Sequence, residues 1–259
     1  MPPDINTHIS GSGGEPITLL HGWGFNGAIW QQTAQALANN ARVTAIDLPG
    51  HGQSPMPTGD YTIESLADLI ADILPQQGNV VGWSLGGMIA MQIALRHPAK
   101  IKRLILVGSV ARFVRDGEWR HAVSPELLQD FSESLNNDLQ QTLQRFVALQ
   151  IMGSDESRIM LRKLRKLMDS NAAPQAAALQ GGLKILQDVD LRGQLPQLRQ
   201  PTLMIFGKRD TLSRPQTAKQ MLPLLPNAQL EIIDGAGHAP FLSHNEHFTN
   251  LIEQFIHEQ

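Results

Sequence analysis

The sequence predicts an α/β fold, with a mostly parallel central sheet that carries helices on both faces. Near-continuous apolar runs, typical of buried strands, occupy residues 16–22, 42–47, 79–83, 102–109, 201–207 and 228–234. Segments with helical spacing alternate with them at residues 28–39, 63–74, 85–97, 216–225 and from about 245 onward. Apolar strands that alternate with helices indicate a parallel sheet covered on both sides. Thr62 is suited to cap the second helix at its N-terminus.

A helical segment without any strand pattern interrupts this alternation. It includes Ser124 and Pro125, a favourable N-cap and first helical residue. We therefore expect a first core part at residues 1–110, a helical lid at 111–190 and a second core part at 191–259. An insertion of this length has the size of a small domain.

The overall composition is that of an ordinary globular protein. The 259 residues are 42% hydrophobic and 17% charged, with a formal net charge of -3. This charge argues against a general nucleic-acid binder, and no apolar run is long enough to span a bilayer. The chain has no cysteine, which excludes disulfides and thiol nucleophiles. Residues 1–10 lack the regions of a secretory signal, so we expect a cytoplasmic protein, as a monomer.

The most informative motif is the G-x-S-x-G pattern at residues 82–86. It falls where an expected strand turns directly into an expected helix. Such a turn pushes the central side chain out above the edge of the sheet, and flanking glycines let the neighbouring backbones approach. We therefore predict that Ser84 is a nucleophile.

A serine nucleophile needs a base, and His238 is the best of the nine histidines. It follows the last expected strand in a glycine-rich loop that can bring it back over the sheet edge. The alternative is a structural loop histidine. His97 fits a helix end, and other histidines fit a solvated surface around the last helix: His244, His247 and His257.

The acid that orients the base should also follow a strand, and Asp210 does so directly. Asp234 is the alternative, but it lies only four residues before His238 and suits a turn. The resulting chain order of serine, aspartate and histidine is that of the α/β-hydrolases, and differs from the order in chymotrypsin or subtilisin.

Two backbone N–H groups should stabilise the negative oxygen of the reaction. The residue after the nucleophile, Leu85, supplies one. The glycine-flanked loop at residues 21–24 nominates Trp23 for the other. The Trp23 and Trp83 side chains would form apolar walls beside the nucleophile, with plain core packing as the alternative.

We expect no metal and no cofactor. No cluster of His, Asp or Glu has the spacing of metal ligands. The glycine-rich stretches at residues 11–14 and 82–87 lack the lysine or acidic partner of a phosphate-binding loop.

These motifs together resemble the α/β-hydrolase superfamily over essentially the whole chain. The resemblance rests on HGWG, DLPGHGQS, GWSLGG, the Asp210 loop and GAGHAPF. Within the superfamily, the chain is similar to the carboxylesterases of biotin synthesis through HGWGFNGAIW, RFVALQIMG, GGLKILQDVDLR and GHAPFLSHNEHF. That family removes the methyl group from the distal carboxylate of a pimeloyl chain held on acyl carrier protein.

The resemblance implies a role for particular residues of this chain. Ser84, Asp210 and His238 would form the triad. The substrate would contact Trp23, Trp83, Leu85 and Phe146, the last of which would line the acyl channel beneath the lid. Acyl carrier protein would dock on Arg145, Arg158 and Arg162. The position one helical turn before Arg145 is Gln141, where the family has a basic residue.

Without the resemblance, two questions stay open. RIMLRKLRK at residues 158–166 has five basic residues in nine, which suits either a solvated helix face or an acidic partner protein. The same triad also serves other hydrolases and lyases of small molecules, such as short-chain esterases, enol-lactone hydrolases and the menaquinone-pathway lyase. A non-catalytic ligand-binding protein on this fold is a further alternative.

Overall fold

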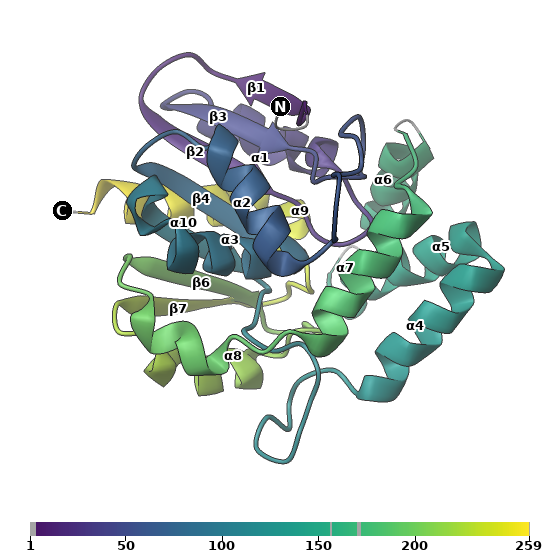
Figure 1. Ribbon diagram of the computed structural model, residues 1–259. Coiled ribbons are helices and arrows are strands. Elements are labelled where there is room, and N and C mark those ends of the chain that lie inside the picture. The colour runs from purple at the N-terminus through teal and green to yellow at the C-terminus, as the bar shows by residue number, and fades with distance from the viewer. Residues whose placement is uncertain (1–3, 156, 170–171, 259) are drawn as a thin grey trace.

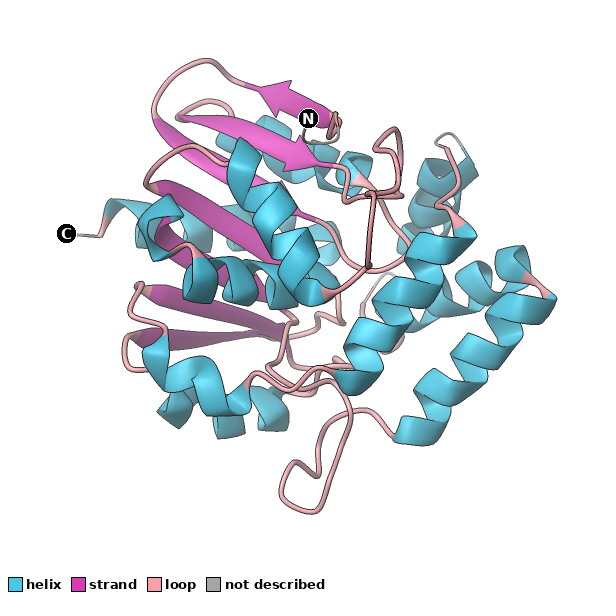
Figure 2. Cartoon of the chain, in the orientation of Figure 1, coloured by secondary structure: helices cyan, strands magenta, loops and turns pink. Residues whose placement is uncertain are grey.

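The chain folds around one sheet, seen in a computed structural model that describes residues 4–155, 157–169 and 172–258 (Figure 2). In this described part, seven strands follow the order β1-β3-β2-β4-β5-β6-β7, and only β1 runs antiparallel to its neighbour. The strands are β1 Thr7–Ser10, β2 Glu15–Leu20, β3 Ala41–Ile46, β4 Gly78–Trp83, β5 Ile101–Val107, β6 Thr202–Gly207 and β7 Ala228–Ile233. The predicted α/β class with a mostly parallel sheet is confirmed.

The first strand was not predicted, because it is a short and polar edge strand. Residues 7–10 carry the sequence THIS, none of these residues is buried, and β1 pairs with β3 alone. A polar edge strand lacks the apolar pattern that identifies central strands. By contrast, β4 and β6 are buried along their whole length.

Helices cover both faces of the sheet (Figure 1). Helices α2 and α3 pack against each other on one face, and α1 and α10 pack together on the other. The core helices are α1 Gln31–Leu37, α2 Ile63–Ile73, α3 Leu85–Arg96, α8 Pro215–Met221, α9 Pro240–Ser243 and α10 Asn245–His257. The predicted cap of α2 is confirmed, because the Thr62 hydroxyl accepts the backbone N–H of Ser65.

Between β5 and β6 lie the helices that were expected from the sequence: α4 Pro125–Asn137, α5 Leu139–Gln150, α6 Ser157–Asp169 and α7 Ala176–Asp188. Ser124 caps α4 by accepting the Leu127 N–H, and Pro125 is its first residue, as predicted. Helix α4 packs on α5 and α7, and α5 packs on α6. This helical group stands beside the end of the sheet where the parallel strands finish (Figure 1).

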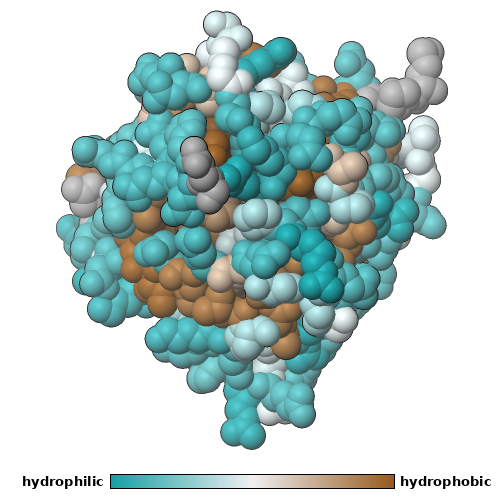
Figure 3. Space-filling view, turned by 90° about the vertical axis from the view of Figure 1, so that its left-hand side faces the viewer, coloured by the Kyte–Doolittle hydropathy of each residue, from teal (hydrophilic) through white to brown (hydrophobic). Residues whose placement is uncertain are grey.

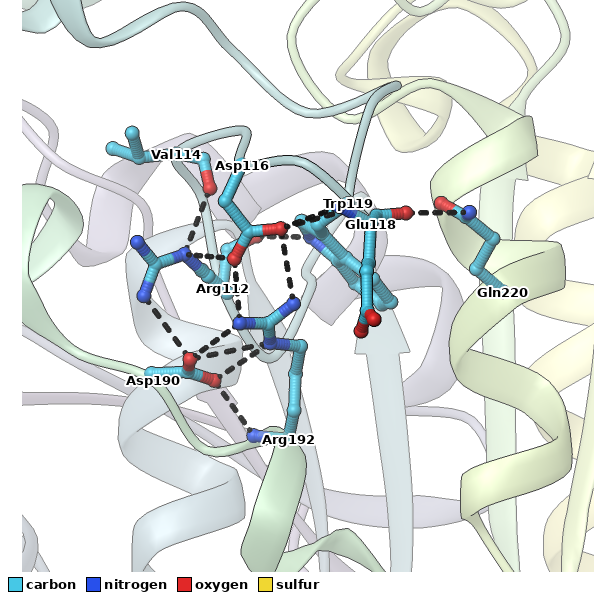
Figure 4. A network of polar contacts seen from close by, with 8 residues as sticks. All are labelled: Arg112, Val114, Asp116, Glu118, Trp119, Asp190, Arg192 and Gln220. Atoms are coloured by element: carbon cyan, nitrogen blue, oxygen red, sulfur yellow. Dashed lines mark hydrogen bonds and ion pairs between the residues drawn. The ribbon is translucent and has the colours of Figure 1, made fainter.

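Ion pairs join the two chain segments that lead into and out of this group (Figure 4). Arg112, which follows β5, binds Asp190 at 3.0 Å, and Arg192 binds Asp116 at 2.7 Å. The Arg192 guanidinium also lies over the Trp119 ring at 5.4 Å. Hydrogen bonds from the Trp119 N–H and from Arg192 lower the pKa of Asp116 to about 2, so the carboxylate stays charged. These ion pairs therefore hold together the two chain segments at the base of the helical group.

The surface is otherwise mixed. The face on the left-hand side of Figure 1 carries a band of hydrophobic residues bordered by hydrophilic ones (Figure 3). Within the residues that the structure describes, no helix is long and apolar enough to cross a membrane.

Candidate active site

Ser84 lies in a strained turn between β4 and α3. Its backbone has φ 54° and ψ -117°, a conformation that residues other than glycine rarely adopt. The turn is tight, because a Cβ at residue 82 would lie 2.5 Å from the Gly86 carbonyl oxygen. A Cβ at residue 86 would lie equally close, 2.5 Å, to the carbonyl oxygen of His21. The sequence therefore needs both glycines to place the serine at the end of the sheet.

His238 and Asp210 form a buried pair. His238 Nδ1 lies 2.7 Å from Asp210 Oδ2, and neither side chain has measurable exposure. The other carboxylate oxygen of Asp210 accepts the backbone N–H groups of Leu212 and Ser213, both at 2.8 Å. Asp234, the alternative acid, instead pairs with Lys208 at the surface. Asp210 is thus oriented on the histidine by its own loop.

The backbone of His238 is held from two sides. The Trp83 indole N–H donates to the His238 carbonyl at 2.9 Å, and the His238 N–H donates to the Gln150 carbonyl at 3.0 Å. Among the described residues, His238 Nε2 is buried without a hydrogen-bond partner. The ring therefore has Nδ1 facing the carboxylate and Nε2 left to accept a proton.

The loop that follows β2 is held by a neutral histidine. His21 Nδ1 donates to the Gly22 carbonyl at 2.8 Å, and His21 Nε2 accepts the Leu48 N–H at 2.9 Å. Burial lowers the pKa of His21 to about 3, so the ring is uncharged at neutral pH. Sequence reasoning assigned His21 no role, although HG directly after a strand could have indicated one.

Both tryptophans singled out in the sequence are buried beside this loop. The Trp23 ring meets the Phe146 ring of α5 edge to face, with centroids 4.6 Å apart. The Trp83 ring lies 5.1 Å from Phe25 and 5.8 Å from His238. Phe146 therefore lies next to the nominated oxyanion residue, whereas Trp83 packs against His238, the predicted base.

A cavity of about 160 Å³ opens between the loop after β2 and helices α5 and α6. Gly24 and Phe25 line it from the loop, Leu143 from α5, and Arg165 from α6. The described residues that line it include none of the residues predicted for the triad, the oxyanion site or the acyl channel. The described residues contain no group of three or more His, Asp or Glu side chains arranged to hold a metal.

The three basic residues taken from the resemblance lie in different settings. The Arg145 guanidinium lies 5.6 Å from the centre of the Phe131 ring, and Arg145 Nη1 donates to Ser134 Oγ at 3.4 Å. Arg158 and Arg162 are exposed on α6. Gln141 is exposed near the start of α5, where Asp138 caps its backbone N–H. The exposed positive charge is thus concentrated on α6.

The chain matches a known family and named relatives over almost its whole length. Residues 15–245 match the family described as alpha/beta hydrolase fold. A pimeloyl-[acyl-carrier protein] methyl ester esterase of Aeromonas hydrophila is 42% identical over 248 residues, which cover 94% of this chain and 96% of that protein. The Photobacterium profundum protein of the same name is 42% identical over 243 residues, covering 94% and 95% of the two chains.

Solved structures share the fold at lower identity. An esterase from Exiguobacterium antarcticum superposes with a TM-score of 0.90 at 23% identity, covering 98% of this chain and 96% of that one. A bromoperoxidase from Bacillus anthracis also gives a TM-score of 0.90, at 20% identity, with coverages of 100% and 97%.

Proposed function

Since the chain belongs to the alpha/beta hydrolase fold family, we propose that it is a serine carboxylesterase that hydrolyses the methyl ester of pimeloyl-[acyl-carrier protein]. One observation carries the chemistry: a strained serine stands at the end of the sheet that also bears a buried histidine–aspartate pair. The substrate class is supported by relatives of that name, which match nearly the whole chain.

In the proposed reaction, His238 Nε2 accepts the Ser84 hydroxyl proton while Ser84 Oγ attacks the ester carbonyl carbon. The tetrahedral intermediate collapses, the bond to the methoxy oxygen breaks, and that oxygen leaves as methanol with the proton from His238. Water then attacks the acyl-enzyme with His238 as base, which releases the carboxylic acid and restores Ser84. Asp210 keeps Nδ1 protonated and stabilises the imidazolium.

The negative oxygen of the intermediate is stabilised by the backbone N–H groups of Trp23 and Leu85. Leu85 is the first residue of α3, so its N–H is one of the unpaired donors at a helix N-terminus. Trp23 lies in the loop that His21 holds in place. Donors fixed before the reaction require little reorganisation in the transition state.

Residues 111–190 act in this proposal as a lid over the acyl chain. Ser84 is only 2% exposed and Phe146 only 5%, so substrate reaches the serine beneath these helices. The Phe146 ring, packed against Trp23, lines the path of the acyl chain in this proposal. Trp83 forms the wall on the other side, against His238.

The acyl carrier protein docks on the basic surface of the lid formed by Arg145, Arg158 and Arg162. The exposed cations of α6 favour an acidic partner over a neutral one. With Gln141 in place of a cation, most of the docking charge falls on α6. A carrier-linked substrate also supports a cytoplasmic location.

The test compares pimeloyl-[acyl-carrier protein] methyl ester with free methyl butyrate, measuring released methanol. We expect a higher kcat/KM for the carrier-linked ester, and loss of both activities in Ser84→Ala with unchanged folding. A fluorophosphonate probe should label the wild-type protein and not this variant. Substantial turnover by Ser84→Ala, or an equal rate with both esters, would contradict the nucleophile or the substrate respectively.

A further inference from the structure

Helix α7 touches the side chains of both residues whose N–H groups stabilise the negative oxygen in the proposed reaction. The Trp23 indole N–H donates to the Leu179 carbonyl at 2.8 Å, and the Trp23 ring is fully buried. The second neighbour of this ring is Phe146 of α5. The Trp23 side chain is therefore bound to two helices of the insertion.

Gly182 is the point of closest approach between α7 and these two residues. A Cβ at residue 182 would lie 2.6 Å from Trp23 Cδ1, 3.2 Å from Trp23 Nε1 and 3.2 Å from Leu85 Cδ2. Trp23 and Leu85 are both fully buried in a packed interior, so neither can move aside freely. The absence of a side chain at residue 182 is what lets α7 lie directly on the oxyanion residues.

The neighbouring glycine performs a different task. A Cβ at Gly181 would collide with the ring of Tyr61, whose hydroxyl donates to the Pro49 carbonyl. Gly181 thus seats the same helix turn against a loop that has no part in the proposed chemistry. Of the two adjacent glycines in GGLKIL, Gly181 faces Tyr61, and Gly182 faces the oxyanion residues.

We infer that Gly182 and the Trp23 indole are positioning elements that make the oxyanion site depend on the seating of α7. When α7 is seated, the Leu179 carbonyl and the flat surface at Gly182 set the place of the Trp23 side chain, and with it the backbone N–H of Trp23. A displaced α7 leaves that N–H without its support. This inference rests on the proposed esterase function.

The test uses Gly182→Ala and Trp23→Phe, with Lys184→Ala on the exposed side of the same helix as the control. Lys184→Ala leaves the packed face of α7 unchanged, whereas Gly182→Ala places a methyl group against Trp23 and Leu85. Trp23→Phe keeps the backbone donor but loses the indole N–H together with the larger ring. We expect kcat to fall about 10- to 100-fold in Gly182→Ala and Trp23→Phe, less than the ~10²–10³ of a lost donor, with little change in Lys184→Ala.

A second substrate separates positioning from general damage. A thionoester places sulfur where the oxyanion forms, and sulfur accepts hydrogen bonds weakly, so the oxyanion donors matter less for its hydrolysis. The losses in Gly182→Ala and Trp23→Phe should therefore be several-fold smaller with the thiono analogue of methyl butyrate than with the ester itself. A merely structural role would reduce both rates equally.

Equal losses on ester and thionoester, or equal losses in Lys184→Ala and Gly182→Ala, would overturn the inference. Thermal unfolding of each variant is measured alongside, and Trp23→Phe decides the matter where Gly182→Ala does not fold. If Ser84→Ala stays active, the proposed function itself fails. If Ser84→Ala is inactive and the positioning variants behave like wild type, only this inference fails.

Discussion

Helices α6 and α7 belong to the same insertion, yet they meet opposite surroundings. Helix α7 buries Leu179, Gly182 and Leu183, and it packs on α4 and on Trp23 and Leu85. Helix α6 buries Met160 and Leu164 and exposes Arg158 and Arg162 to solvent. Close packing therefore constrains the residues of α7, whereas the exposed face of α6 is distinguished by its positive charge. In the proposed function, the insertion therefore serves catalysis and partner recognition through separate helices, and variants of each helix can distinguish the two roles.

The largest expected effect comes from the core beneath both helices. Asp210→Asn keeps an oxygen for the Leu212 and Ser213 N–H groups but presents an amide N–H to His238 Nδ1. The proton then sits on Nε2, and the histidine cannot act as base. We expect kcat to fall about 10³- to 10⁴-fold, equally for carrier-linked and free esters. Steady-state kinetics on both esters checks this, and a loss confined to one of them would contradict a shared triad.

As the pH falls, the protein should lose stability through His21 and His51 before the ion pairs at the base of the insertion are affected. Burial lowers the pKa of His21 to about 3 and of His51 to about 4, so folding excludes protons that the unfolded chain binds below about pH 6.5. Their stabilising contribution is complete above that pH and is lost as the pH falls toward these values. Each histidine should lower the unfolding free energy by about 1.4 kcal/mol per pH unit.

Urea unfolding at pH 7, 6 and 5 measures this slope. His51→Gln should remove its share of the slope whatever its effect on stability at pH 7. The low pKa of Asp116, about 2, places the loss of the basal ion pairs in a separate and more acidic range. A slope that is unchanged in His51→Gln would contradict the assignment.

The charged face of α6 should affect only the carrier-linked substrate. Reversing Arg158 and Arg162 to Glu should raise KM for the carrier-linked ester about 10-fold, since lost charge complementarity of this size is worth about 1.4 kcal/mol. The free ester should be unaffected. Reversal of two exposed cations outside the insertion, Arg42 and Lys219, gives a control with the same change in net charge. Equal effects of the two double variants would argue against docking on α6.

The smallest expected effect is on the free energy of unfolding, when one helix cap is removed in the core or in the insertion. Thr62 caps α2 in the core, and Ser124 caps α4 in the insertion. Each change to alanine removes one cap and should cost about 1 kcal/mol of unfolding free energy. If the insertion unfolds with the core, both variants shift one shared urea transition. A separate early transition in Ser124→Ala alone would show that the insertion unfolds on its own.

Much of the fold could be predicted because the apolar pattern records burial directly. Continuous apolar runs predicted β2 to β7, and the caps at Thr62 and Ser124 were placed correctly. The edge strand β1 was missed, because exposed residues carry no such pattern. The three residues of the predicted triad could be nominated because each follows a strand, and parallel strands bring their carboxyl ends to one edge.

Several local features can be read from the sequence alone: a glycine-flanked serine between strand and helix, an aspartate and a histidine after later strands, and a basic helix. How these features meet depends on tertiary packing. It set Asp210 rather than Asp234 on His238, seated Gly182 on Trp23 and Leu85, and joined Arg112 to Asp190 across the insertion. Such contacts join residues far apart in the chain, and their distances depend on how whole elements pack, which no local pattern records.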